Sequence, residues 1–323
     1  MTRFLAAVLV VLAGPTLSLW AQPFSTEEVT FQSDDVTLAG SILVPTGTGP
    51  FPGLVLVHGS GSSSRDNPWT SAYAEALVRK GIVVLHPDKR GSGDSGGSWL
   101  SAGIEHLARD AVAAAELLAG RPEVDASRLG LVGFSQGGHV IPVAASMSPE
   151  IDFLINISGS VVPILEQIGD ELRLAAAREG LDGVGLRAVA DIHGKAVAFA
   201  IGGGSWTSYR DALAHAASLG LSETDVISGF PTDPESPAWG FLQALGDFAP
   251  LPYWQSLSIP VAFVYGGNDH NVDVPKNTRL ITEVLSGSRV EYTLQVFGTN
   301  GHALFREDLI AFLSSWIAAG GRD

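Results

Sequence analysis

Short apolar runs alternate with segments of helical periodicity along most of this chain, and this alternation limits the possible folds more than any other feature. Each apolar run has the length of a strand that is buried on both faces. The predicted strands are residues 53–58, 82–86, 129–134 and 153–157, and the predicted helices between them are residues 68–80, 104–119 and 136–146. Because the connections are short, we expect an α/β fold in which helices cover both faces of a mostly parallel sheet.

The alternation stops after residue 160, where only helical segments follow, at residues 164–179, 207–219 and 237–245. Beyond residue 260 it resumes, with strands at 261–265 and 290–296 and helices at 276–285 and 306–318. Two extended segments, 28–32 and 37–44, precede the first buried strand. We therefore expect one α/β core formed by residues 22–160 and 251–323, interrupted by a helical cap formed by residues 161–250.

The first 21 residues have the features of a secretory signal peptide. Arg3 provides a positive charge, residues 4–13 form an apolar run, Gly14 and Pro15 end that run, and Ala21 provides a small residue for cleavage. The apolar run is too short to cross about 30 Å of hydrocarbon at about 1.5 Å per residue. We expect residues 1–21 to be removed and the mature protein to be secreted or periplasmic, with no membrane span.

Composition excludes several classes of partner and site. The chain has 34 Asp and Glu against 19 Lys and Arg, a formal charge of −15, which disfavours binding to nucleic acids or anionic lipids. It has no cysteine, and therefore no disulfide, thiolate metal site or cysteine nucleophile. Its eight histidines show no metal-ligand spacing, and the G-x-G-x-x-G match at residues 91–96 opens no helix that would receive a pyrophosphate. We predict neither a metal nor a cofactor.

Two pentapeptides match G-x-S-x-G, the pattern of a serine held on a sharp turn between a strand and a helix. The match around Ser135 follows the apolar run LGLVGF and precedes the helical segment QGGHVIPVAAS. The match around Ser95 has polar loop residues on both sides. Because the turn exposes the serine hydroxyl only between a strand and a helix, Ser135 is the predicted nucleophile and Ser95 is interpreted as a turn residue.

A serine hydroxyl needs a base, and the base needs an acid that orients it. Asp269 follows the predicted strand 261–265, and His302 follows the last predicted strand, so the chain order is serine, acid, histidine. We predict Asp269 as the acid, with Asp273 as the fallback. We predict His302 as the base over its rival His270, which lies directly beside Asp269.

Acyl transfer also needs donors for the oxyanion. The backbone N–H of Gln136 follows the predicted nucleophile and is the first candidate. The second candidate is the N–H of Ser60, in the loop after strand 53–58. His58 begins this loop, and we interpret it as a residue that braces the loop by hydrogen bonding rather than as a catalytic base.

With these residues the chain resembles the α/β-hydrolase superfamily over residues 27–320. It is most similar to bacterial exported hydrolases of the serine-aminopeptidase-like and acyl-thioesterase-like branch. The segments that carry the resemblance are LVLVHGSGSSSRD at 54–66, HPDKRGSGDSGG at 86–97, RLGLVGFSQGG at 128–138, GGNDHNVDVP at 266–275 and FGTNGH at 297–302. The helical insertion matches no cap of known substrate, and the serine at 135 argues against the dehalogenases and epoxide hydrolases of this superfamily, which use an aspartate nucleophile.

The sequence therefore predicts a secreted serine hydrolase that cleaves a small-molecule carboxylic ester through Ser135, His302 and Asp269. A serine aminopeptidase or a thioesterase with the same three residues is the alternative. For the aminopeptidase, Glu166, Asp170 and Glu171 are available to bind a substrate ammonium. A binding or sensor protein that keeps the fold without catalysis is the alternative from another class. The sequence makes no prediction of the oligomeric state.

Overall fold

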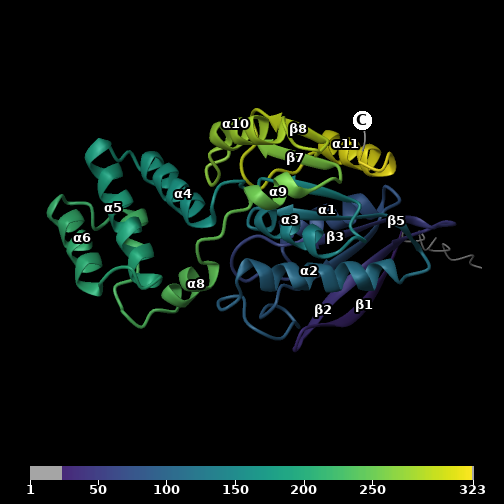
Figure 1. Ribbon diagram of the computed structural model, residues 1–323, viewed down its shortest axis with the longest axis horizontal. Helices are drawn as coiled ribbons and strands as arrows, with labels where there is room; N and C mark the ends of the chain where they lie inside the picture. Colours follow the sequence, from purple (N-terminus) through teal and green to yellow (C-terminus); the bar gives the residue numbers. More distant parts are fainter. Residues whose placement is uncertain (1–23, 322–323) are drawn as a thin grey trace, which may run out of the picture.

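The computed structural model describes residues 24–321, whose eight strands form one sheet with the strand order β1-β2-β4-β3-β5-β6-β7-β8 (Figure 1). β3 to β8 run parallel to one another, and β1 and β2 add an antiparallel edge. The strands are β1 (Phe24–Ser33), β2 (Val36–Pro45), β3 (Phe51–Val57), β4 (Val83–Pro87), β5 (Val124–Phe134), β6 (Phe153–Ile157), β7 (Val261–Gly266) and β8 (Tyr292–Phe297). The predicted α/β fold class is confirmed.

The predicted signal peptide, residues 1–21, lies outside the described residues. From residue 24 to residue 321, no helix has both the length and the apolar character needed to cross a membrane.

Helices cover the two faces of the sheet, and each face has its own hydrophobic cluster. On one face, α1 (Pro68–Val78) and α11 (Glu307–Ala318) pack their buried residues, such as Leu77 and Leu313, against the sheet. On the other face the covering helices include α2 (Ile104–Ala119), α3 (Gly137–Met147), α9 (Leu251–Ser256) and α10 (Val274–Leu285), whose apolar side chains belong to a second cluster. Burial on both faces explains why the central strands are continuous apolar runs.

The order of the central strands determines where a site can form. The chain passes from β3 to β4 on one side and then returns to β5 on the other side of β3. At such a reversal the connections leave the strand ends in opposite directions, and ligands bind in the crevice at the carboxyl ends of the strands. The carboxyl ends of β3 and β5 are Val57 and Phe134.

Six helices lie between β6 and β7, and the first five of them share a hydrophobic cluster of their own (Figure 1). These five are α4 (Ile164–Arg178), α5 (Gly183–Ala200), α6 (Trp206–Ser218), α7 (Asp225–Ser228) and α8 (Pro237–Leu245). Trp239 lies at the centre of this cluster, with edge-on ring contacts to Phe199, Trp206 and Tyr209. In Figure 1 these helices, in teal and green, stand to one side of the sheet and its covering helices.

The helix α5 and the short helices α7 and α9 were not predicted from the sequence. Three glycines within α5 weaken its helix propensity, which obscures the pattern. The helix forms because the Asp182 carboxylate caps it, accepting hydrogen bonds from the N–H groups of Val184 and Gly185. Val189 and Ile192, three residues apart, are then buried in the cluster of the five helices.

Candidate active site

Ser135 lies on a sharp turn between β5, which ends at Phe134, and α3, which begins at Gly137. Its backbone φ is +52°, a left-handed conformation that is strained for a residue with a side chain. The turn is held in place because the Ser135 N–H donates to the Ile157 carbonyl oxygen at 3.0 Å. A strained strand-to-helix turn of this kind lifts the serine hydroxyl above the sheet, where it is exposed at the strand ends.

The glycines on either side of Ser135 allow the backbone to make this turn. A Cβ atom on Gly133 would lie 2.5 Å from the backbone of Gly137, and one on Gly137 would lie 2.4 Å from the Val57 carbonyl oxygen. Both distances are shorter than a side chain permits. The turn therefore packs directly against the end of β3, and this packing explains why the pattern needs small residues next to the serine.

Asp269 and His302 are brought together from two different loops. Asp269 follows β7 and His302 follows β8, and the His302 Nδ1 lies 2.9 Å from Asp269 Oδ2 and 3.1 Å from Oδ1. The Asp269 side chain is fully buried, and its Oδ1 also accepts hydrogen bonds from the N–H groups of Asn271 (2.8 Å) and Val272 (3.0 Å). The carboxylate is therefore fixed in orientation, and it holds the imidazole through Nδ1.

No hydrogen bond joins the Ser135 hydroxyl to the His302 ring in residues 24–321, but Phe134, which precedes Ser135, and His302 both contact Trp69. The Trp69 ring lies 5.1 Å from the Phe134 ring and 5.5 Å from the His302 ring. Ser158, at the end of β6, donates through its hydroxyl to the His302 carbonyl oxygen at 2.8 Å. Catalytic hydrogen bonds are often long before the substrate binds. Ser135 follows β5 and His302 follows β8, so both lie at the carboxyl edge of the sheet, with β6 and β7 between their strands.

The other residues considered from the sequence have structural roles or lie on the surface. Asp273 caps α10, accepting from the Lys276 N–H at 3.1 Å. His270 is exposed. The Ser95 hydroxyl donates to the Asp88 carbonyl oxygen at 2.8 Å and accepts a hydrogen bond from the Ala39 N–H. Both hydrogen bonds hold it inside a buried turn.

The candidate oxyanion residues, Ser60 and Gln136, line the same cavity as Ser135. The cavity lies between the strand ends and the helices α4, α5 and α8, and together with its opening to solvent it has a volume of about 1050 Å³. Its walls are mostly apolar, with Ile168, Leu172, Phe230, Trp239, Phe241 and Leu242 among them. In the described part of the chain, no group of three or more His, Asp or Glu side chains is arranged to hold a metal ion.

The loop after β3 is braced by His58. Its Nε2 lies 2.6 Å from the Pro87 carbonyl oxygen, and its Nδ1 lies 3.0 Å from the Ser63 hydroxyl. Burial lowers the pKa of His58 to about 4, so the ring is neutral at pH 7. In a neutral ring whose Nε2–H donates to the Pro87 carbonyl oxygen, Nδ1 accepts a hydrogen bond from the Ser63 hydroxyl. Both ring nitrogens of His58 therefore hold the loop in place.

The buried histidines predict acid-sensitive stability. Burial lowers the pKa of His58 and His139 to about 4 and that of His86 to about 3, whereas in the unfolded chain each titrates near 6.5. Between about pH 6.5 and 4 the unfolded chain therefore binds protons that the folded chain excludes, so stability falls as the pH is lowered through this window. We expect Tm to be lower at pH 5 than at pH 7.5 by about 5 °C or more.

Circular dichroism melting at the two pH values measures this difference. His86→Gln should reduce the pH dependence, while the exposed His270→Gln should leave it unchanged. A wild-type Tm that is equal or higher at pH 5 would contradict the neutral assignment of these rings.

Comparison with known proteins agrees with this architecture. Residues 68–168 match the prolyl oligopeptidase family (Peptidase_S9). Esterase EstD of Thermotoga maritima is 26% identical over 282 residues, which are 85% of this chain and 60% of the relative. An esterase structure from Pyrococcus furiosus superposes with a TM-score of 0.61 at 18% identity, covering 92% of this chain and 90% of the other. The chain belongs to the α/β-hydrolase superfamily.

A further structure, Est1E from Butyrivibrio proteoclasticus, superposes with a TM-score of 0.58 at 14% identity, covering 91% of this chain and 98% of the other. These structural matches show the fold. This α/β-hydrolase spans about 60% of the length of the Thermotoga esterase. The region that matches the prolyl oligopeptidase family includes Ser135 and its turn.

Proposed function

We propose that this α/β-hydrolase is a secreted serine hydrolase that cleaves carboxylic esters through an acyl-enzyme intermediate. One arrangement carries the proposal: a strained turn presents Ser135 to an apolar cavity, and a fixed Asp269–His302 pair lies after β7 and β8, at the same edge of the sheet. The esterase names of the Thermotoga relative and of the Pyrococcus furiosus structure support the choice of ester over amide.

In this mechanism Asp269 accepts the Nδ1–H of His302, which leaves Nε2 free to take the proton of the Ser135 hydroxyl. The serine oxygen attacks the ester carbonyl carbon, and the N–H groups of Ser60 and Gln136 donate to the oxyanion. His302 then gives its proton to the leaving alcohol. Water, deprotonated by His302, attacks the acyl-enzyme and releases the carboxylic acid and the free serine.

In this proposed function, residues 161–250 form a cap over a core formed by residues 22–160 and 251–323. Helices α4, α5 and α8 of this insertion contribute the apolar wall of the cavity, and the strand ends contribute Ser135 and its neighbours. An apolar wall opposite the nucleophile is suited to an acyl chain or another uncharged group of the substrate. Residues 1–21 are proposed to direct export, and the mass of the mature protein recovered from the cell envelope or medium tests this.

One acidic residue in the cavity favours the aminopeptidase as a second candidate. Of the three acids considered, Glu166 and Asp170 bind Lys276, whereas Glu171 lines the cavity and accepts a hydrogen bond from the Asn271 side chain at 2.6 Å. Burial raises the pKa of the Glu171 carboxyl. In its ionised form this group would bind a substrate ammonium.

A substrate panel separates these functions. Purified protein is assayed with nitrophenyl esters of graded acyl length, with matched thioesters and with aminoacyl anilides, and kcat/KM is compared. The proposal predicts the highest kcat/KM on esters. A preference for anilides with a free amino group would replace it by the aminopeptidase, and hydrolysis of none of them would support the non-catalytic alternative.

Glu171→Gln sharpens the distinction, because it removes the carboxylate and keeps the shape of the side chain. We expect kcat/KM on uncharged nitrophenyl esters to change by only a few-fold. A loss of about 100-fold confined to substrates with an ammonium group would instead assign Glu171 to substrate binding, since a hydrogen-bonded ion pair contributes about 2–3 kcal/mol. Glu166→Gln is the matched control, because its carboxylate binds Lys276 outside the cavity.

A further inference from the structure

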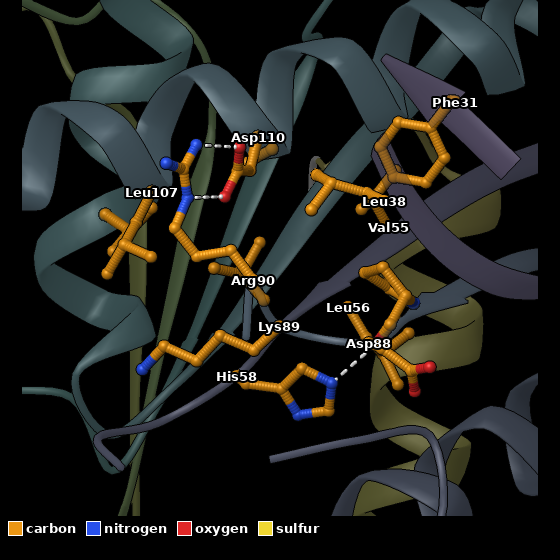
Figure 2. A pocket seen from close by; sticks show the side chains of 14 residues that line it. Phe31, Leu38, Val55, Leu56, His58, Asp88, Lys89, Arg90, Leu107 and Asp110 are labelled. Atoms are coloured by element: carbon orange, nitrogen blue, oxygen red, sulfur yellow. Dashed lines mark hydrogen bonds and ion pairs between the residues drawn. The ribbon is translucent and has the colours of Figure 1, made fainter. Parts of the chain in front are cut away.

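Lys89 is a buried cation beside the candidate active site whose role the mechanism leaves unexplained. It follows β4, and only 8% of the residue's surface is exposed to solvent. In residues 24–321 it forms no salt bridge, because the nearby Asp110 binds Arg90 through both carboxylate oxygens. Figure 2 shows the Lys89 ammonium pointing away from the Arg90–Asp110 pair and from the Asp88 side chain. Burying a charge without a counterion costs free energy, so the hydrogen bonds that the ammonium forms must offset that cost.

The Lys89 ammonium binds the two chain segments that carry the candidate oxyanion donors. Its Nζ donates to the Gly59 carbonyl oxygen at 2.7 Å and to the Gln136 side-chain oxygen Oε1 at 2.9 Å. Gly59 precedes Ser60, and Gln136 follows Ser135. One ammonium therefore bridges the loop after β3 and the turn that precedes α3.

The Gly59 carbonyl belongs to the same peptide group as the Ser60 N–H. In a planar trans peptide the C=O and N–H bonds point in opposite directions, so a cation that fixes the carbonyl also fixes the direction of the N–H. A hydrogen bond to the carbonyl also polarises the peptide and strengthens its N–H as a donor. This peptide lies beside the nucleophile, because a Cβ atom on Gly59 would be 3.2 Å from the Ser135 Cβ.

We infer that Lys89 is a positioning residue of the oxyanion hole. Its ammonium holds the Gly59 carbonyl and the Gln136 side chain so that the N–H groups of Ser60 and Gln136 converge on the oxyanion that forms when Ser135 attacks. The inference rests on the proposed function, because it assumes that Ser135 is acylated. It adds a residue that does not touch the substrate and acts through the two donors.

The charge of Lys89 gives this role a pH signature. Burial lowers the pKa of the Lys89 ammonium to about 7, and the Asp110 carboxylate opposes that shift. The bridging ammonium is therefore present below about pH 7 and is lost as the pH rises through it. The other titratable or charged groups around it are His58 at the end of β3, Asp88 and Arg90 on its own loop, and Asp110 on α2.

Lys89→Met tests the inference, because it keeps the length of the side chain and removes the charge and the donors. We expect kcat for a nitrophenyl ester to fall by about 10- to 100-fold at pH 6.5, less than the loss of a whole oxyanion donor, with KM changed by only a few-fold. Wild-type kcat should decline between about pH 7 and 9, and the variant should lack this decline. A purely structural lysine would instead lower Tm and leave the kcat of the folded protein and its pH profile unchanged.

Lys89→Arg provides the second measurement, including the case in which Lys89→Met fails to fold. Arginine stays charged throughout this range, so the ratio of kcat at pH 6.5 to kcat at pH 9 should fall to about one, whatever the absolute rate. Either variant with the wild-type pH decline, or Lys89→Met with wild-type kcat, overturns the inference. A wild-type protein that hydrolyses no ester and does not react with a fluorophosphonate contradicts the proposed function instead.

Discussion

Ser135→Ala should reduce ester hydrolysis by on the order of 10⁶-fold, to the level that binding and oxyanion stabilisation alone support. The reason is that, within residues 24–321, Ser135 is the one hydroxyl residue that lines the cavity from a turn with positive φ. Ser158 also has a positive φ, but its hydroxyl donates to the His302 carbonyl oxygen and it does not line the cavity. The φ of +52° is set by the backbone packing of the turn, which alanine does not change. We therefore expect the variant to fold with a Tm close to that of the wild type. The measurement is kcat with a nitrophenyl ester, together with a melting curve.

Ser95→Ala is the matched control, because the same pentapeptide pattern surrounds it. Its hydroxyl donates to the Asp88 carbonyl oxygen and accepts from the Ala39 N–H, and neither partner belongs to the candidate site. The variant should lose about 1–3 kcal/mol of stability, because buried partners are left unpaired, and keep its kcat. If Ser95→Ala were inactive while Ser135→Ala remained active, the two serines would have been assigned the wrong way round.

Asp269→Asn should lower kcat by on the order of 10⁴-fold, the second-largest expected effect. Oδ1 of Asp269 accepts two backbone N–H groups, so in the variant the amide oxygen should stay at that position. The amide NH₂ would then take the place of Oδ2, which lies 2.9 Å from the His302 Nδ1. An NH₂ group there donates to Nδ1 and leaves the proton on Nε2, so that the histidine no longer accepts the proton of Ser135.

Asp273→Asn is the control for this prediction, because asparagine caps a helix as well as aspartate does. Asp273 accepts from the Lys276 N–H at the start of α10 and binds Arg173, so activity should be nearly unchanged. The kcat values of both variants are measured over a range of pH. An active Asp269→Asn protein, or an inactive Asp273→Asn protein that is still folded, would move the acid from residue 269 to another position.

The core strands and the chain order of the candidate site residues were predictable from the sequence. The reason is that each candidate residue directly follows a strand and is marked by the residues next to it in the sequence. Residues 129–134 form a buried strand that leads into Ser135, and the residues around Ser135 fit a turn so tight that Gly137 approaches the Val57 carbonyl oxygen. Asp269 and His302 each follow a strand, and parallel strands bring their carboxyl ends to the same edge. Local patterns and the chain order therefore select these residues as candidates, and the catalytic roles assigned to them stay predictions.

Two features were not predictable, because they depend on tertiary contacts. The helix α5 contains glycines that obscure its pattern, and it is stabilised by the capping of Asp182 and by packing of residues such as Ile192 against the neighbouring helices. Lys89 was overlooked because a lysine in a polar loop ordinarily points into solvent. Its burial between Gly59 and Gln136 depends on two segments that are distant in the sequence.

Covalent labelling tests the central claim most directly. Wild-type protein, Ser135→Ala and Ser95→Ala are incubated with a fluorophosphonate, and the mass of each intact protein and of its peptides is measured. The account predicts one adduct on Ser135 in the wild type and in Ser95→Ala, and none in Ser135→Ala. An adduct on Ser135→Ala, or a wild-type protein that hydrolyses esters but is labelled at another residue, would contradict it.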